Sequence, residues 1–171
     1  MKNIIITGAA SGIGKAAYEA INKDLYQTII LVDKDQISVD CDKTKAYQVD
    51  VSSEDEMKAV FKDLESKDIL INYALNAAGV PGPNRPFSVT RISDFKKIMD
   101  INFMGTMISM KYELKMMEKV GNGRIINLAS VLARCGMTGS SSYAASKGAI
   151  ISASKCLAIE YAEKNLSLIH I

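Results

Sequence analysis

Histidine is nearly absent from this chain, which has His170 as its one histidine among 171 residues. A mechanism that needs a histidine base, or a metal site rich in histidine, is therefore disfavoured. The three cysteines, Cys41, Cys135 and Cys156, are odd in number and lack C-x-x-C spacing. That pattern argues against a disulfide framework and a zinc site, and is typical of reduced thiols in the cytosol. We predict a cytoplasmic protein that holds no metal.

Long apolar runs and a strong charge of one sign are also missing. No uncharged apolar run approaches the ~18–20 residues that span a membrane. The first expected strand begins so early that we expect no signal peptide before it. The net charge is only +2, with both signs interspersed, so the composition does not indicate a nucleic-acid partner. We expect neither a membrane nor a nucleic acid as partner.

Proline is scarce, and all three prolines lie in the segment 79–86. This segment is expected to be a loop and not a domain linker, since no repeat or low-complexity tract accompanies it. The chain is 48% hydrophobic and 23% charged, which is typical of a globular protein. Its length suffices for one domain and is short for two. We predict a single domain over 1–171.

Apolar and amphipathic segments alternate along the chain. The pattern predicts strands at about 2–7, 28–33, 45–50, 69–76 and 123–130, and helices at about 12–24, 53–65, 101–120 and 143–164. Strand–helix alternation of this kind indicates an α/β protein with a doubly wound parallel sheet, right-handed crossovers and helices on both faces. Ligands of such sheets bind beyond the carboxyl ends of the strands.

A glycine-rich turn, Thr7–Gly14, joins the first expected strand to the first helix. Glycines at that place let the backbone approach a pyrophosphate, and the helix N-terminus offers free N–H groups to the anion. The glycines run G-x-x-x-G-x-G, so neither the P-loop nor the G-x-G-x-x-G pattern is present. A tight turn that only needs positive φ would use the same residues.

Polar residues end the next three expected strands. Asp33 lies 19 positions after Gly14, about where an acidic residue binds a ribose 2′-hydroxyl and repels a 2′-phosphate. This favours NAD over NADP, although the neighbouring Lys34 would help to tolerate the phosphate. Asp50 and Asn76 are expected to face the same crevice. Each of these residues, taken singly, is also an ordinary turn former.

The last expected strand ends in Ser130, and Tyr143 and Lys147 follow on the next helix. Because these two are four residues apart, they share one helix face. A lysine ammonium favours the phenolate form of a nearby tyrosine, which can then exchange a proton with a carbonyl or alcohol oxygen. Ser130 would hydrogen-bond the same oxygen. Taken alone, the pair could equally be an ordinary surface pair.

Together these motifs resemble the short-chain dehydrogenase/reductase family. The resemblance extends from Lys2 to about Asn165 in family order. It is carried by Thr7–Gly14, Asp50-Val51, Asn76-Ala77-Ala78-Gly79, Asn102, Ser130 and Tyr143-x-x-x-Lys147. Ala77 departs from it, since many members have a second asparagine there.

The resemblance implies a Rossmann-like fold and hydride transfer between NAD(H) and an alcohol/ketone pair. It implies that Tyr143 is the general acid/base, that Lys147 favours its phenolate and holds the nicotinamide ribose, that Ser130 orients the substrate, and that Asn102 positions a water in a proton relay. The cofactor-binding residues that it implies are Gly8, Ser11, Gly12, Ile13, Gly14, Asp33, Asp50, Val51, Asn76, Ala77, Ala78, Gly79, Tyr143 and Lys147.

The chain stops at Ile171, where a further strand of the family would begin. We therefore expect a truncated sheet that lacks the last strand or strands, with reduced activity, and Ser167–Ile171 need not be native. Alternatives are a cofactor-binding module without catalysis, or a fragment that does not fold. Substrate determinants are expected partly in 133–142, where Cys135 and Met137 either line the pocket or only pack.

Two expected helices are apolar nearly all round, namely 101–119 and 143–163. One face of each must cover the sheet, and a second apolar face needs another cover. In the family these helices pack against their copies in a partner subunit, which implies a homodimer or homotetramer. Core filling is an alternative explanation for their methionines.

Overall fold

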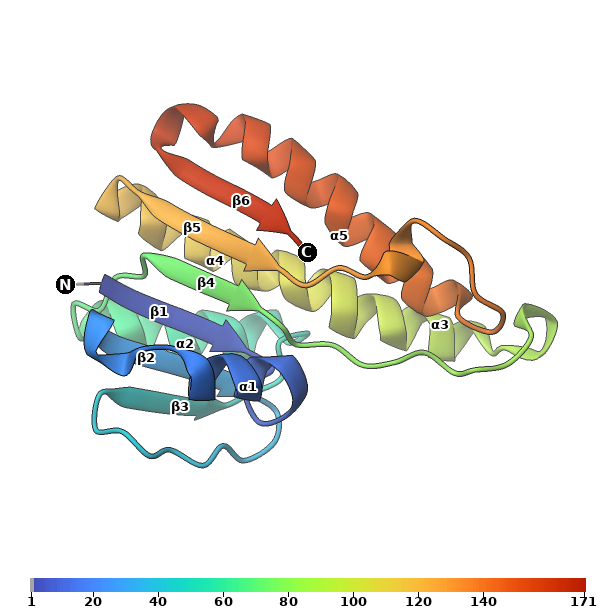
Figure 1. Ribbon diagram of the computed structural model, residues 1–171, viewed down its shortest axis with the longest axis horizontal. Coiled ribbons are helices and arrows are strands. Elements are labelled where there is room, and N and C mark those ends of the chain that lie inside the picture. Colours follow the sequence, from blue (N-terminus) through green and yellow to red (C-terminus); the bar gives the residue numbers. More distant parts are fainter. Residues whose placement is uncertain (1) are drawn as a thin grey trace.

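A parallel sheet of six strands forms the centre of the protein (Figure 1). The structure is a computed structural model, and it describes residues 2–171. The strands are β1 (Lys2–Thr7), β2 (Tyr26–Asp33), β3 (Thr44–Gln48), β4 (Tyr73–Asn76), β5 (Gly123–Asn127) and β6 (Leu166–His170). Their order is β3-β2-β1-β4-β5-β6, and every pairing is parallel. The predicted α/β fold, Rossmann-like and doubly wound, is confirmed.

Helices cover both faces of the sheet, as the alternation predicted. They are α1 (Gly12–Ala20), α2 (Glu54–Ser66), α3 (Ile92–Ile98), α4 (Gly105–Val120) and α5 (Ser141–Glu160). Helix α1 lies on the near face in Figure 1, and α2, α4 and α5 lie on the far face. Successive residues of β1 point to opposite faces. Ile4 and Ile6 therefore pack toward Tyr18 of α1, whereas Ile5 packs toward the opposite helices.

Local sequence signals correctly predicted the bounds of β1 and the capped start of α2. β1 spans the residues that the sequence predicted, and α2 begins at Glu54 with Ser53 as its N-cap, where the Ser53 hydroxyl accepts from the Glu56 amide. The sixth strand was expected only to begin near the chain end. It is formed, because Leu166–His170 pairs in register with Gly123–Asn127 of β5.

The prediction for the helix at 101–120 was wrong at its start. Helical structure begins at Ile92 with α3 and continues through the π-helical turn Met99–Met104 into α4. The side chain of the N-cap residue Arg91 makes no capping hydrogen bond. Without a capping side chain, the acidic Asp94 in the first turn is the one local signal for a helix start at Ile92, and it is a weak one.

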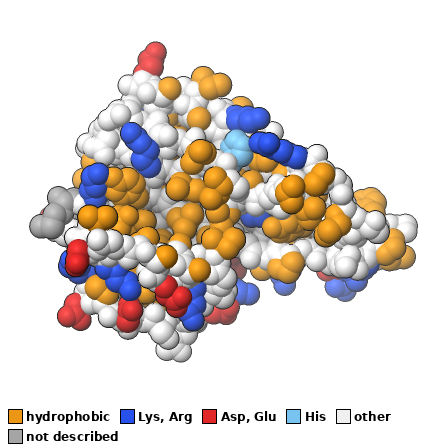
Figure 2. Space-filling view, viewed as in Figure 1, with side chains coloured by type: hydrophobic (Ala, Val, Ile, Leu, Met, Phe, Trp, Pro, Cys, Tyr) orange, Lys and Arg blue, Asp and Glu red, His pale blue; other side chains and the backbone are white. Residues whose placement is uncertain are grey.

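The near face of the sheet is covered unevenly. Beyond α1, Ile126 of β5 is 37% exposed and its neighbour Ile169 of β6 is 52% exposed. Figure 2 shows hydrophobic side chains gathered on this face. None of the helices in residues 2–171 is long and apolar enough to cross a membrane.

Candidate functional site

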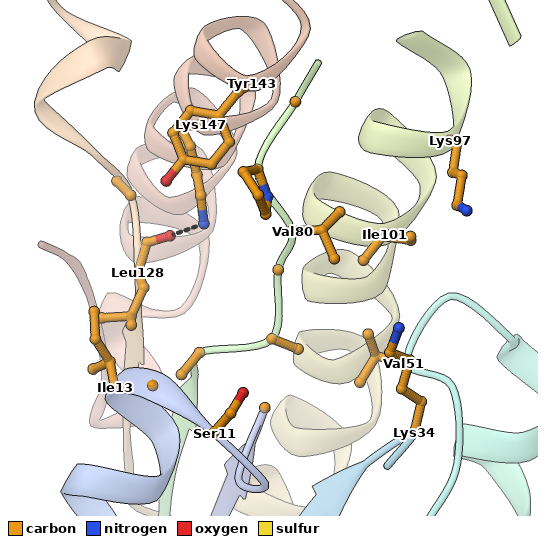
Figure 3. Close-up of a pocket in the computed structure, with 18 of the residues that line it drawn as sticks. Ser11, Ile13, Lys34, Val51, Val80, Lys97, Ile101, Leu128, Tyr143 and Lys147 are labelled. Atoms are coloured by element: carbon orange, nitrogen blue, oxygen red, sulfur yellow. Dashed lines mark hydrogen bonds between the residues drawn. The ribbon is translucent and has the colours of Figure 1, made fainter. Parts of the chain in front are cut away.

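The carboxyl ends of the strands surround a cavity of about 860 Å³ (Figure 3). That volume is within the range of small-molecule sites. The predicted cofactor-binding residues that line it are Gly8, Ser11, Gly12, Ile13, Asp33, Asp50, Val51, Ala77, Ala78, Gly79, Tyr143 and Lys147. Among the described residues, Gly14, Asn76, Asn102 and Ser130 are not part of the lining.

Two glycines of the turn, Gly12 and Gly14, are required for different structural reasons. Gly12 adopts a φ of +53°, and a side chain there would meet no atom within 4 Å, so this glycine meets a backbone requirement at the cavity wall. Gly14 differs, because a Cβ atom would lie 2.1 Å from the carbonyl oxygen of Gly8. Gly14 therefore lets α1 sit against the turn without lining the cavity. The N-cap Ser11 makes no side-chain capping bond, so the first-turn amides of α1 are available to an anion.

Asp33 is held rigidly at the end of β2. Its Oδ2 accepts from the amide of Ala10 at 2.9 Å, and its Oδ1 accepts from the amide of Asp35 at 3.0 Å. A carboxylate has about four acceptor positions, so lone pairs remain for a hydroxyl in the cavity. Lys34 also lines the cavity, which puts a cation beside this carboxylate. Asp50 uses Oδ1 to accept from the amide and hydroxyl of Ser52.

Tyr143 and Lys147 project from α5 into the same cavity, across from Lys34 (Figure 3). The Nζ atom of Lys147 lies 5.8 Å from the centroid of the Tyr143 ring and donates to the carbonyl oxygen of Leu128 at 2.7 Å. Lys147 is only 5% exposed, and burial lowers its pKa to about 8. The ammonium form still prevails at neutral pH.

Asn102 lies in the π-helical turn and is fully buried. Its Oδ1 accepts from the amide of Val80 at 2.8 Å, and its Nδ2 donates to the carbonyl oxygen of Val80 and to the hydroxyl of Ser146. The carboxamide thus clamps the loop after β4. A Cβ on Gly79 would lie 3.2 Å from Asn102 Oδ1 and 3.6 Å from Lys147 Nζ, so both groups approach Gly79.

Ser130 caps the short 3₁₀ turn Val131–Ala133, because its hydroxyl accepts from the amide of Leu132 at 3.2 Å. Its neighbours Ala129 and Leu132 line the cavity. The sequence did not decide whether Cys135 and Met137 line the pocket or only pack. In the structure Met137 lines the cavity. Cys135 is exposed and donates to the carbonyl of Val131.

Asn76 is buried and does not line the cavity. It lies beneath the cavity floor, which is formed by Gly8, Ala77 and Leu128. Its Nδ2 donates to Glu113 Oε2 at 3.0 Å and to Asn127 Oδ1 at 2.9 Å. Glu113, on α4, is fully buried, and burial raises its pKa to about 8 while the bond from Asn76 opposes that rise. Neither partner of Asn76 could be found from the sequence, because they come from elements far along the chain.

Several cavity residues were missed by sequence reasoning. Val80, Pro81, Gly82 and Asn84 come from the proline-rich loop, whose position after a strand end was the available signal. Lys97 and Ile101 come from the helical segment whose start was not predicted. The remaining ones are Asp35, Leu128, Ala129 and Leu132. Lys34 and Ser140 also line the cavity, and the sequence had pointed to both, to Lys34 as the neighbour of Asp33 and to Ser140 within 133–142.

Comparison with known proteins finds one class of relatives, the dehydrogenases and carbonyl reductases. The chain is 28% identical over 175 residues to the 3beta-hydroxysteroid dehydrogenase of Mediterraneibacter gnavus. That match covers 97% of this chain and 63% of the relative, so the chain spans less than two thirds of that protein's length.

Solved structures give the same class. The complex of 4-hydroxyisoleucine dehydrogenase with NADH and succinate superposes with a TM-score of 0.87 at 27% identity, covering 95% of this chain and 75% of that one. The structure of ElxO with NADP bound superposes with a TM-score of 0.91 at 29% identity, covering 99% and 71%. The family model for short chain dehydrogenases matches residues 2–171, and the chain belongs to that family.

Replacing Glu113 with glutamine is expected to remove a pH dependence of stability. In the unfolded chain Glu113 ionises near pH 4.5, whereas in the folded chain it keeps its proton to about pH 8. Its contribution to stability is therefore fully present below pH 4.5 and is lost as the pH rises to about 8. In urea unfolding, the free energy of unfolding of Glu113→Gln relative to that of the wild type should rise by roughly 4 kcal/mol between pH 4.5 and about 8.

The matched control is Glu118→Gln on the same helix, where the carboxylate is exposed and pairs with Lys164. This variant should track the wild type. Parallel stability curves for the wild type and Glu113→Gln would show that Glu113 ionises normally in the folded protein.

Proposed function

We propose that this protein is an NAD(H)-dependent oxidoreductase that interconverts a secondary alcohol and a ketone. The observation that carries the proposal is the buried Lys147 beside Tyr143 in a cavity shared with the glycine turn and Asp33. The residues present fit the cofactor. Gly12 leaves open space, the start of α1 offers amides, and Asp33 offers acceptors for a ribose diol.

The residues proposed to transfer the proton, Tyr143 and Lys147, lie on α5. The bound cofactor supplies or accepts the hydride. Tyr143 then gives a proton to the carbonyl oxygen, or takes one from the alcohol. In this role the Lys147 ammonium would stabilise the phenolate of Tyr143, and its donors not used by Leu128 would hold a ribose hydroxyl of the cofactor. Ser130, beside the lining residue Ala129, would orient the substrate oxygen.

Asn102 is proposed to position the proton relay rather than to touch the substrate. Its carboxamide holds Val80 and Ser146, and its Oδ1 and Lys147 Nζ approach Gly79 from the same side. Asn102 would thus fix the loop at Gly79 and Val80, which passes close to Lys147. A water in the relay would be bound within that frame.

NADH is expected to bind more tightly than NADPH, because the Asp33 carboxylate repels a 2′-phosphate. The measurement is a fluorescence titration of the 171-residue chain with each cofactor. Asp33→Asn keeps the shape and removes the charge, so its preference for NADH should fall by about tenfold or more. Equal affinities in the wild type would refute the preference, and no binding of either cofactor would refute the proposed function.

Tyr143→Phe is expected to lower kcat/KM by roughly 10²–10⁴-fold, because the proton donor is lost. NADH binding should persist, since Lys147 and Asp33 remain. Turnover is measured on a panel of cyclic and acyclic secondary alcohols. Tyr161→Phe, at the end of α5 and outside the cavity lining, is the matched control. A wild type that binds NADH but turns over no alcohol would favour a cofactor-binding module without catalysis.

We also propose self-association through helices 101–119 and 143–163 as a homodimer or homotetramer. Met110, Met116 and Met117 fill the core, but Met104 is 44% exposed and Ile159 is 80% exposed. Such apolar exposure on two helices suits a partner surface. Light scattering at micromolar concentration should give two or four times 18.6 kDa, and Ile159→Asp should reduce that mass. A mass of one chain for the wild type would contradict the proposal.

A further inference from the structure

Glu113 is a buried acid that the proposed chemistry does not use. It lies in the middle of α4 with 0% of its surface exposed. Its Oε2 accepts from Asn76 Nδ2 at 3.0 Å, and its Oε1 has no hydrogen-bond partner among residues 2–171. A carboxyl group left half-satisfied in a core costs stability, so its presence calls for a function.

The group to which Glu113 binds connects three strand ends. Asn76 ends β4, and its Nδ2 donates to Asn127 at the end of β5. Its Oδ1 accepts from the hydroxyl of Thr7 at the end of β1. Asn127 in turn donates to Ser154 of α5. One buried network therefore joins β1, β4, β5 and two helices.

The residues that follow these three strand ends form the cavity floor. Gly8 follows β1, Ala77 follows β4, and Leu128 follows β5, and all three line the cavity. Leu128 also accepts the hydrogen bond from Lys147. A displacement of Asn76 would therefore reach the floor directly, without any contact between Glu113 and the cavity.

We propose that neutral Glu113 is a positioning residue that holds the cavity floor through Asn76, and that loss of its proton weakens NAD(H) binding. The proposal rests on the proposed cofactor site. It adds a second buried group, outside the cavity, on which cofactor affinity depends.

Among the residues that the structure describes, the surroundings of Glu113 do not compensate a negative charge. The polar groups of the network are neutral, namely Asn76 on β4, Asn127 on β5 and Ser154 on α5. The side chains that α2 buries are apolar: Met57, Val60, Phe61 and Leu64. Within residues 2–171 no charged group contributes to the pKa of Glu113, which burial raises to about 8.

Ionisation must therefore draw water into this packing or move α4 away from the strand ends. Either change loosens the hold on Asn76. A cofactor that needs the ordered floor binds the protonated protein better, and by reciprocity its binding raises the pH at which Glu113 loses its proton. The coupling is thus measurable from both sides.

The experiment follows the protonated-carboxyl band in infrared spectra of the 171-residue chain against pH, with and without NADH. Glu113→Gln identifies the band by its absence. The dissociation constant of NADH is measured over the same pH range for the wild type, Glu113→Gln and Glu113→Met. Glu118→Gln on the same helix is the control for removal of one carboxylate.

We expect the band to persist above pH 7 and its midpoint to rise when NADH is bound. Between pH 7 and 9 the dissociation constant of the wild type should rise about tenfold more than that of Glu113→Gln. Lys147 titrates in the same range, so its effect is common to both proteins and cancels in their comparison. Glu113→Met should bind NADH more weakly at every pH, because Asn76 loses an acceptor, whereas glutamine restores binding.

Equal pH profiles for the wild type and Glu113→Gln, with a band midpoint that NADH leaves unchanged, would overturn the inference while leaving the cofactor site intact. A wild type that binds neither NADH nor NADPH at pH 6.5 would overturn the proposed function and the inference together. Should Glu113→Met fail to fold, the comparison of the wild type with Glu113→Gln decides the matter alone.

Discussion

Parallel strand pairing is the constraint on which the rest of this structure depends. Because all six strands run in one direction, their carboxyl ends meet at one edge of the sheet. Four of the five connections between successive strands contain a helix, and the loop 34–43 alone joins β2 to β3. The register joins Thr7 to Asn76 and Asn76 to Asn127. The loops that leave these positions therefore converge, and residues distant along the chain become walls of one cavity.

Desolvation gives the site its two unusual ionisable groups. Burial lowers the pKa of Lys147 to about 8 and raises that of Glu113 to about 8, because it disfavours charge in a base and in an acid alike. The lysine faces the cavity and retains its charge at neutral pH, while the glutamate lies beneath the floor without charge. The cavity thus has the Lys147 ammonium in its wall and a neutral polar network beneath its floor.

Much of the architecture was predictable from short-range patterns. The apolar run of β1, the serine cap and acidic first turn of α2, and the glycine turn each report a local requirement of the backbone. The start at Ile92 was missed because its stabilisation is tertiary: no cap marks it, and α3 continues through the π-helical turn into α4. β6 needed β5 as a template, and five residues at a chain end give little pattern of their own.

The sequence by itself determined the fold class, the family, and the spacing that brings Tyr143 and Lys147 to one helix face, because these depend on periodicity and neighbours in the chain. The tertiary structure alone decided which polar residues face the cavity. It put Asn76 beneath the floor, committed the carboxamide of Asn102 to Val80, and buried Glu113 without a charged partner. Those outcomes depend on hydrogen-bond partners 22 to 69 positions away, which no local pattern specifies.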